Sequence, residues 1–147
     1  MTPLEYAEHL RKEFEDFALG CDPVVKLPEL SYSKMGDPVI ACEALIFAST
    51  NVDATPLFDE VGAKCGVIQV GTFIAALARD CAYEMNEDGS DNVKEVERIS
   101  AQIDKDGDCL WDWALTVDGY MVKDFSLGFA ITGGLAITSL QMTIGVP

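Results

Sequence analysis

Residues 125–147, FSLGFAITGGLAITSLQMTIGVP, contain two strand-like runs separated by Gly133 and Gly134. Glycine tolerates a positive φ, which both central residues of a tight hairpin turn require. We therefore expect a β-hairpin whose second strand extends to the end of the sequence, in a compact unit without an appended tail. The apolar positions of that strand change phase at Thr138 and Ser139, which predicts a β-bulge there.

The first third of the chain begins with a helix signal and continues with an extended segment. Thr2 and Pro3 suit an N-cap and a first helical turn, and apolar residues follow at helical spacing, so residues 1–20 predict an N-terminal helix. Residues 21–38 contain three prolines and predict an extended loop. The largely apolar residues 39–49 predict a strand that is covered on at least one face.

The middle of the chain predicts a loop, a long strand and two helices. Residues 50–64 predict a loop, whereas residues 66–85 predict a long strand with a bulge or bend near Gly71. Helical spacing then marks residues 93–103 and, after an interruption by the sequence DKDGD, residues 109–117.

Capping residues support two separate helices in that region. Residues 90–92, Ser-Asp-Asn, offer a cap for the first helix, and Asp108 offers one for the second. The order of helix, two strands, two helices and two strands predicts an α+β fold. We expect a mainly antiparallel mixed sheet of about four strands flanked by helices, in a single domain over residues 1–147 with an α/β core over residues 39–147.

The composition excludes several classes of function. The chain has 147 residues, of which 49% are hydrophobic, so it is long enough to build a core. Its net charge of −15 repels nucleic acid and anionic membranes, so specific DNA binding is not expected. Residues 1–10 lack the features of a signal peptide, and residues 125–146 are too interrupted to span a membrane as a helix. The five cysteines form no CxxC pair, and in a reducing cytoplasm they are expected to be free thiols.

Residues suited to catalysis or metal binding are sparse. His9 is the only histidine, and it lies on the polar side of the expected first helix, which leaves no Ser-His or Cys-His pair in view. Residues 84–95 match an EF-hand calcium loop in part, but Glu84 and Asp91 depart from the pattern, and turn chemistry explains the same residues. No glycine motif for phosphate binding is present. We expect no enzyme activity, no cofactor and no metal.

Apolar side chains in polar segments are candidates for contacts with other proteins. Such side chains occur in segments 31–36 and 50–64, where nothing in the local sequence would bury them, although isolated apolar loop residues are also common. The two tryptophans lie two residues apart and point to different sides of a helix, so one can pack in the core and the other can reach an interface. The candidate contact residues are Tyr32, Met35, Leu57, Phe58 and Trp113.

Four short motifs, taken in order, resemble the tail terminator proteins of long-tailed phages of actinobacteria. They are IACEAL (40–45), CGVIQVGTFIAALARDC (65–81), the acidic glycine turn MNEDGSD (85–91) and GGLAITSLQMTIGVP (133–147). The resemblance covers residues 39–147, and the first helix also fits by position. The usual aromatic residue of the last strand is absent, with Leu140 or Met142 in its place, so another role in the phage neck stays open.

The resemblance implies a structural virion protein without catalysis or cofactor. Such a protein forms a ring, usually of six copies, that caps the finished tail tube and stops its polymerisation. The implied partners are further copies of the chain, the major tail tube protein and the head-to-tail connector or stopper, with DNA passing through the ring. The implied location is the tail and neck of the virion, assembled in the host cytoplasm. The alternatives are another neck protein, such as the head-to-tail stopper, or a small calcium- or ligand-binding domain.

Calorimetric titration with calcium at about millimolar concentration is expected to show no site-stoichiometric heat, because the loop at 84–95 departs from the ligand pattern of an EF-hand. A one-to-one isotherm that disappears in Asp88→Ala would contradict this expectation and would favour the calcium-binding alternative.

Overall fold

The protein is an α+β domain built on one mixed sheet, as the sequence predicts, with five strands instead of about four. The computed structural model describes residues 2–22, 25–40, 42–79, 81, 83–117, 121–132 and 134–146. Its elements in chain order are α1 (Pro3–Ala18), β1 (Leu30–Met35), β2 (Ala44–Phe58), β3 (Lys64–Arg79), α2 (Val93–Thr116), β4 (Met121–Thr132) and β5 (Leu135–Val146).

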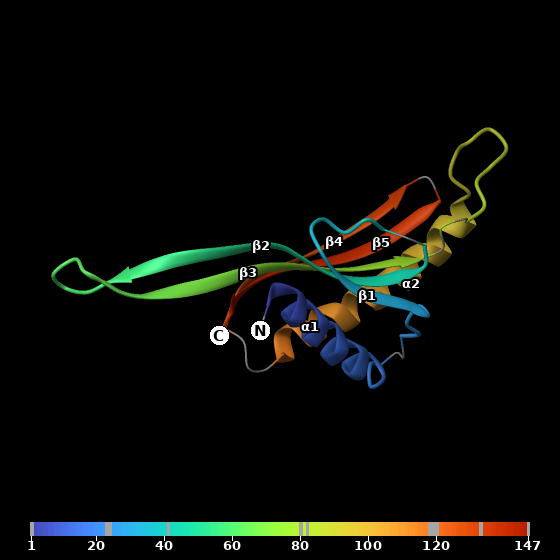
Figure 1. Ribbon diagram of the computed structural model, residues 1–147. Helices are drawn as coiled ribbons and strands as arrows, with labels where there is room; N and C mark the ends of the chain where they lie inside the picture. Colours follow the sequence, from blue (N-terminus) through green and yellow to red (C-terminus); the bar gives the residue numbers. More distant parts are fainter. Residues whose placement is uncertain are drawn as a thin grey trace.

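The sheet has the strand order β1-β2-β3-β5-β4, and both helices lie on one of its faces (Figure 1). Only β1 and β2 are parallel, and the other neighbours are antiparallel. The chain between β1 and β2 runs back across the opposite face, where the Tyr32 hydroxyl donates to the Val39 carbonyl over 3.3 Å. β5 is paired on both sides, with β3 and with β4, so the last strand is an integral part of the fold.

Helix α1 begins where its first residues predict. The backbone N–H of Thr2 donates to the Glu5 carboxylate over 2.7 Å, and the Thr2 hydroxyl accepts from the Glu5 N–H over 3.2 Å, which completes a capping box. Pro3 occupies the first turn, where a missing N–H costs nothing. The buried face of the helix comprises Tyr6, Ala7, Leu10, Phe14 and Ala18.

Three aromatic rings join both helices to the sheet. The ring centroids of Phe14 in α1 and Phe47 in β2 lie 6.0 Å apart, and Trp113 in α2 lies 5.6 Å from the first and 5.7 Å from the second. Trp113 is only 2% exposed, so the prediction that it reaches an interface is wrong. The other tryptophan, Trp111, is 37% exposed and contacts Phe125 at a centroid distance of 4.9 Å.

The predicted break at DKDGD is absent, because α2 is continuous and buries two residues of that sequence. Asp106 receives two hydrogen bonds of 3.0 Å from the Arg79 guanidinium and one of 3.1 Å from Gln102. Gly107 leaves room for a neighbour, since a Cβ there would lie 2.7 Å from the ring of Phe129. Asp108 is therefore an ordinary helical residue instead of a second N-cap, and Asn92 caps the whole helix.

The predicted bulge at Thr138 and Ser139 is also absent. No register shift occurs in β5 at these residues, and the shift in the β4–β5 hairpin lies between Val122 and Asp124. Thr138 is buried on the helix-facing side, and its hydroxyl donates to the Ile103 carbonyl over 3.2 Å. A polar residue therefore continues the buried row of this strand, which made the apolar pattern change phase in the sequence.

Several predicted strand boundaries are wrong as well. The expected loop over 21–38 contains β1, and the strand expected over 39–49 begins at Ala44 and continues to Phe58. The loop expected over 50–64 is therefore mostly strand. The β2–β3 pair has one register irregularity between Ser49 and Asn51, opposite Phe73 and Thr72 and so beside Gly71 as predicted, although the extra residue is in β2. A second irregularity lies next to Phe58.

Four of the five cysteines are paired, contrary to the expectation of free thiols. Cys21, just after α1, is joined to Cys109 in α2, and Cys42 is joined to Cys81. Cys65 is free and exposed. The first bridge spans a sequence separation of 88 residues. Closing a loop of that length lowers the entropy of the unfolded chain by an amount worth on the order of 4–5 kcal/mol.

Arg79→Met should lower the free energy of unfolding by about 3–5 kcal/mol near neutral pH, because it leaves the buried Asp106 carboxylate without its ion-pair partner. Adding Asp106→Leu should recover most of this loss. Urea unfolding measures both variants, and a loss below about 1 kcal/mol in the single variant would contradict the prediction.

The same variant should show a distinctive pH dependence. Burial raises the pKa of Asp106, although its bonds to Arg79 and Gln102 lower it in part. A carboxyl group whose pKa is higher in the folded state than in the unfolded state gains stability as the pH falls through the folded value. Removing Arg79 takes away its lowering effect, so the pKa of Asp106 is higher in Arg79→Met than in the wild type. The difference in unfolding free energy between the variant and the wild type should therefore narrow as the pH falls below neutrality.

Candidate functional site

The outer half of the β2–β3 hairpin extends beyond the rest of the protein (Figure 1). The pairing of β1 with β2 ends at Ser49, and the pairing of β5 with β3 ends at Gln69. Residues 54–68, here called the arm, therefore form a two-stranded ribbon with no further strand beside it. The remainder of the described chain is called the body.

The end of the arm is an ordered turn over residues 59–63, here called the tip loop. The Asp59 carboxylate accepts from the N–H of Val61 over 3.0 Å and from that of Ala63 over 2.8 Å. Gly62 adopts a positive φ of 83° and donates its N–H to the Asp59 carbonyl over 3.0 Å. The tip loop thus has a defined shape without a contact to the body.

The arm carries large apolar side chains that nothing in the body covers. Phe58 is 63% exposed and Val61 is 88% exposed. A two-stranded ribbon is marginally stable by itself, and a group of exposed apolar side chains is typical of an interaction site. Pro56 has no N–H to donate, which suits a strand whose outer edge has no partner strand. The exposed large apolar residues of the arm are Leu57, Phe58, Val61, Val67 and Ile68.

The structure brings together only two of the five predicted contact residues. Leu57 and Phe58 both lie in the arm, although in a strand instead of a loop. Met35 is exposed at the end of β1, opposite Ser49 in β2, five residues before the arm begins at Ala54. Tyr32 is half-buried against the β2 residues of the face opposite the helices, and Trp113 lies in the core.

Three exposed apolar residues of the arm were not recognised from the sequence. Val61 lies in the tip loop, and Val67 and Ile68 lie in the outer part of β3, within the long strand predicted over 66–85. The signal that was available is that Val67 and Ile68 are adjacent in a strand, which places an apolar residue on each face of the ribbon.

A hollow of about 400 Å³ lies where the arm meets the body, and is here called the root hollow. Its walls are mostly apolar and come from β2, β3, β4 and β5. Among the described residues of the lining, Lys123 is the one that is charged, and it is also the only Lys or Arg in the sequence after Lys105. The lining residues are Thr55, Ile68, Val70, Val122, Lys123 and Gly145.

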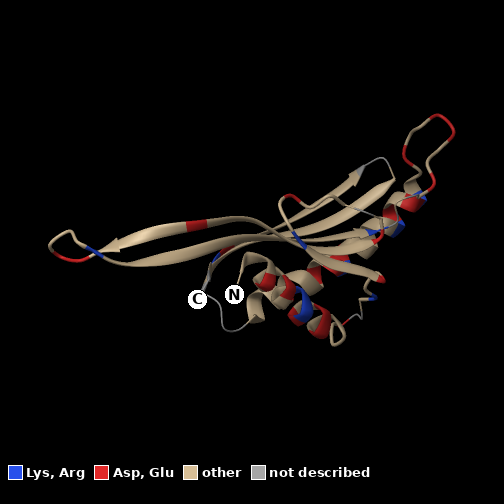
Figure 2. Cartoon of the chain, viewed as in Figure 1, with Lys and Arg blue, Asp and Glu red and all other residues tan. Residues whose placement is uncertain are grey.

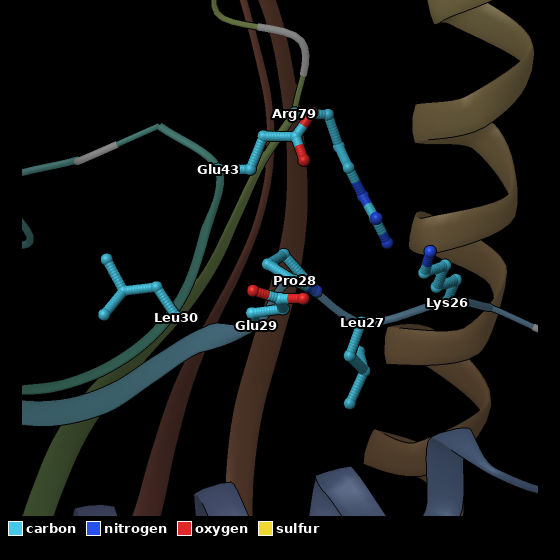
Figure 3. A pocket seen from close by; sticks show the side chains of 7 residues that line it. All are labelled: Lys26, Leu27, Pro28, Glu29, Leu30, Glu43 and Arg79. Atoms are coloured by element: carbon cyan, nitrogen blue, oxygen red, sulfur yellow. The ribbon is translucent and has the colours of Figure 1, made fainter.

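A second hollow, of about 450 Å³, lies at the opposite end of β3 (Figure 3). Lys26 and Arg79 point toward the same space, but Arg79 already binds Asp106 through two nitrogens. Glu29 and Glu43 line the same hollow, so its cations and carboxylates balance. Leu27, Pro28 and Leu30 complete the lining.

The acidic turn before α2 is held by its own hydrogen bonds. The Asp88 carboxylate accepts from the backbone N–H and the hydroxyl of Ser90, and these two bonds lower the pKa of Asp88. The Asn86 side chain donates to Ser90 and to the Asp91 carbonyl. Within the described ranges, no three His, Cys, Asp or Glu side chains lie where they could hold a metal ion.

Acidic residues cover the helices, the turn before α2 and the tip loop, whereas most of the ribbon between body and tip is uncharged (Figure 2). His9 lies on the exposed side of α1, with its Nε2 3.0 Å from a Glu13 carboxylate oxygen. Among the helices of the described residues, none is both long enough and apolar enough to cross a membrane.

No protein-family model matches the chain, and no curated protein matches it significantly. The arm, the root hollow and the charge distribution are therefore the observations from which function is inferred.

Replacing residues 55–68 by Asn-Gly, which joins the paired residues Ala54 and Gln69 through a two-residue turn, should leave a folded protein. None of the removed residues is buried, so the unfolding midpoint should change by less than about 4 °C. Circular dichroism during heating measures this change. A shortened protein that aggregates or loses its cooperative transition would show instead that the arm supports the body.

Proposed function

We propose that the protein is a tail terminator of a long-tailed phage, a structural subunit whose ring caps the tail tube, stops its polymerisation and joins it to the head-side connector. The observation that carries this proposal is the arm, a preformed apolar ribbon on a folded α+β body. The sequence motifs of the chain also resemble those of tail terminators. The proposal includes no catalysis, cofactor or metal.

An arm of this kind favours a ring over a compact dimer. It projects from one end of the sheet, so its tip can contact a surface of a neighbour that differs from itself. A contact between two different surfaces is heterologous, and it closes into a ring when the rotation between neighbours allows it. Six copies are the number that the resemblance implies.

The negative charge of the subunit also suits a ring through which DNA passes. Six subunits of charge −15 would give a ring a charge of about −90. Such a ring repels the phosphate backbone, so DNA would pass without adhering to the wall. The same repulsion acts between subunits, so assembly would depend on a few apolar anchors, and Phe58 is the largest exposed one in the arm.

Phe58→Ala should fold normally but assemble poorly, because truncating a central aromatic anchor costs about 2 kcal/mol or more, which is roughly a 30-fold weaker contact. Light scattering against concentration should give about 95 kDa for the wild type, six times 15.9 kDa, and a smaller mass for the variant. Capping of purified tail tubes should fall in parallel.

Leu115→Ala is the matched control, because Leu115 is similarly exposed but lies on α2, away from the arm. It should assemble and cap tubes like the wild type. A wild type that stays monomeric alone and on tube ends would refute the ring. Binding to the head-side connector but not to the tube would identify the runner-up, another neck protein such as the stopper.

A further inference from the structure

The root hollow is an apolar surface with one lysine, and the tip loop carries apolar side chains and a carboxylate that could bind there. We propose that the tip of one copy docks in the root hollow of a second copy, with Phe58 and Val61 against its apolar wall and Glu60 facing Lys123. This inference rests on the proposed function, since it names the contact between neighbouring subunits of the ring.

The tip is shaped before it binds. One oxygen of the Asp59 carboxylate accepts from two backbone N–H groups of the tip loop, whereas Glu60 has no such bond among the described residues. Glu60 is therefore the acidic side chain that the tip is better able to turn toward a partner. Val61 is the most exposed large apolar residue named in the arm, at 88%. A preformed knob of this kind loses little conformational entropy when it docks.

The root hollow can accept such a knob. A cavity of about 150 Å³ is enough to hold benzene, and the hollow of about 400 Å³ leaves room for a phenyl ring together with a second apolar side chain. Ile68, Val70 and Val122 supply an apolar wall. Docking would therefore cover apolar surface on both copies.

Charge selects the tip as the occupant. A chain with 25 acidic and 10 basic residues repels further copies of itself, so a contact between copies needs a local cation. Lys123 provides that cation at the hollow, and neither Lys123 nor Glu60 has an ion-pair partner among the described residues. A pair of opposite charges across the contact favours this docking and disfavours other orientations.

The occupant must come from another molecule. Thr55 lines the hollow and Phe58 lies three residues further along the same strand, which is paired with β3 up to that point. A paired ribbon cannot fold back so tightly on itself. Tip and hollow are different surfaces, so the contact repeats from copy to copy.

Charge reversal tests the contact. Glu60→Lys and Lys123→Glu should each raise the dissociation constant of the assembly at least about 10-fold, because each places like charges together. The double variant should return to within a few-fold of the wild type. An equimolar mixture of the two single variants should also assemble, because every contact in an alternating ring then joins opposite charges.

Matched control variants separate the effect of the Glu60–Lys123 pair from the effect of a change in net charge. Glu87→Lys and Lys94→Glu change the total charge by the same amounts at exposed positions outside the arm and hollow, and they should leave the dissociation constant near that of the wild type. Sedimentation velocity near physiological ionic strength reports the masses. Circular dichroism confirms that each variant is folded.

The outcomes distinguish this contact from the proposed function. A wild-type ring that the single reversals disturb no more than their controls would overturn the docking contact and leave the ring intact. A wild type that is monomeric in all conditions would overturn both proposals. A particle of about 32 kDa, twice 15.9 kDa, with full rescue by the charge swap would support the docking as a reciprocal pair and contradict the ring.

Discussion

The packing of Phe14, Phe47 and Trp113 determines where the protein is two layers thick. These rings fix both helices against the inner part of β2. α2, the longer helix, has 24 residues and is about 36 Å long, whereas the 16 residues of β3 extend over about 50 Å. Because the helix layer is shorter than the longest strands, their outer ends have no layer to pack against. The arm is the direct result of this difference in length.

Local signals predicted the parts of the fold that depend on local interactions. The capping box at Thr2 and the cap at Asn92 mark the starts of the helices, and β4 and β5 form the expected antiparallel pair, whereas Gly133 of the expected turn lies outside the described residues. Residues whose role depends on distant partners were misread. Asp106 resembles a turn residue until Arg79, 27 positions away, is placed beside it, and Thr138 resembles a bulge until it meets Ile103.

The candidate site shows the same division. Leu57 and Phe58 could be recognised because apolar residues stood in a polar segment. Lys123 could not be recognised, because it becomes a candidate contact residue only when it lies beside Ile68 and Val70, which come from a different hairpin. Nor could the sequence decide which tryptophan is buried, because Trp111 and Trp113 sit in the same helix and only the position of the sheet separates them. The cysteine pairs, 88 and 39 residues apart, were hidden for the same reason.

The register shift between Ser49 and Asn51 lies where β1 ends and the sheet narrows from five strands to four, shortly before the arm begins at Ala54. There the Thr50 hydroxyl donates to the Thr72 carbonyl over 3.3 Å across the irregular pair. A narrow ribbon bends more readily than a wide sheet backed by helices, and a bulge adds local twist. Mechanical compliance is thus concentrated in the arm and in the irregular pair that precedes it. Neighbours joined through such arms could follow a range of curvatures without any change inside the body.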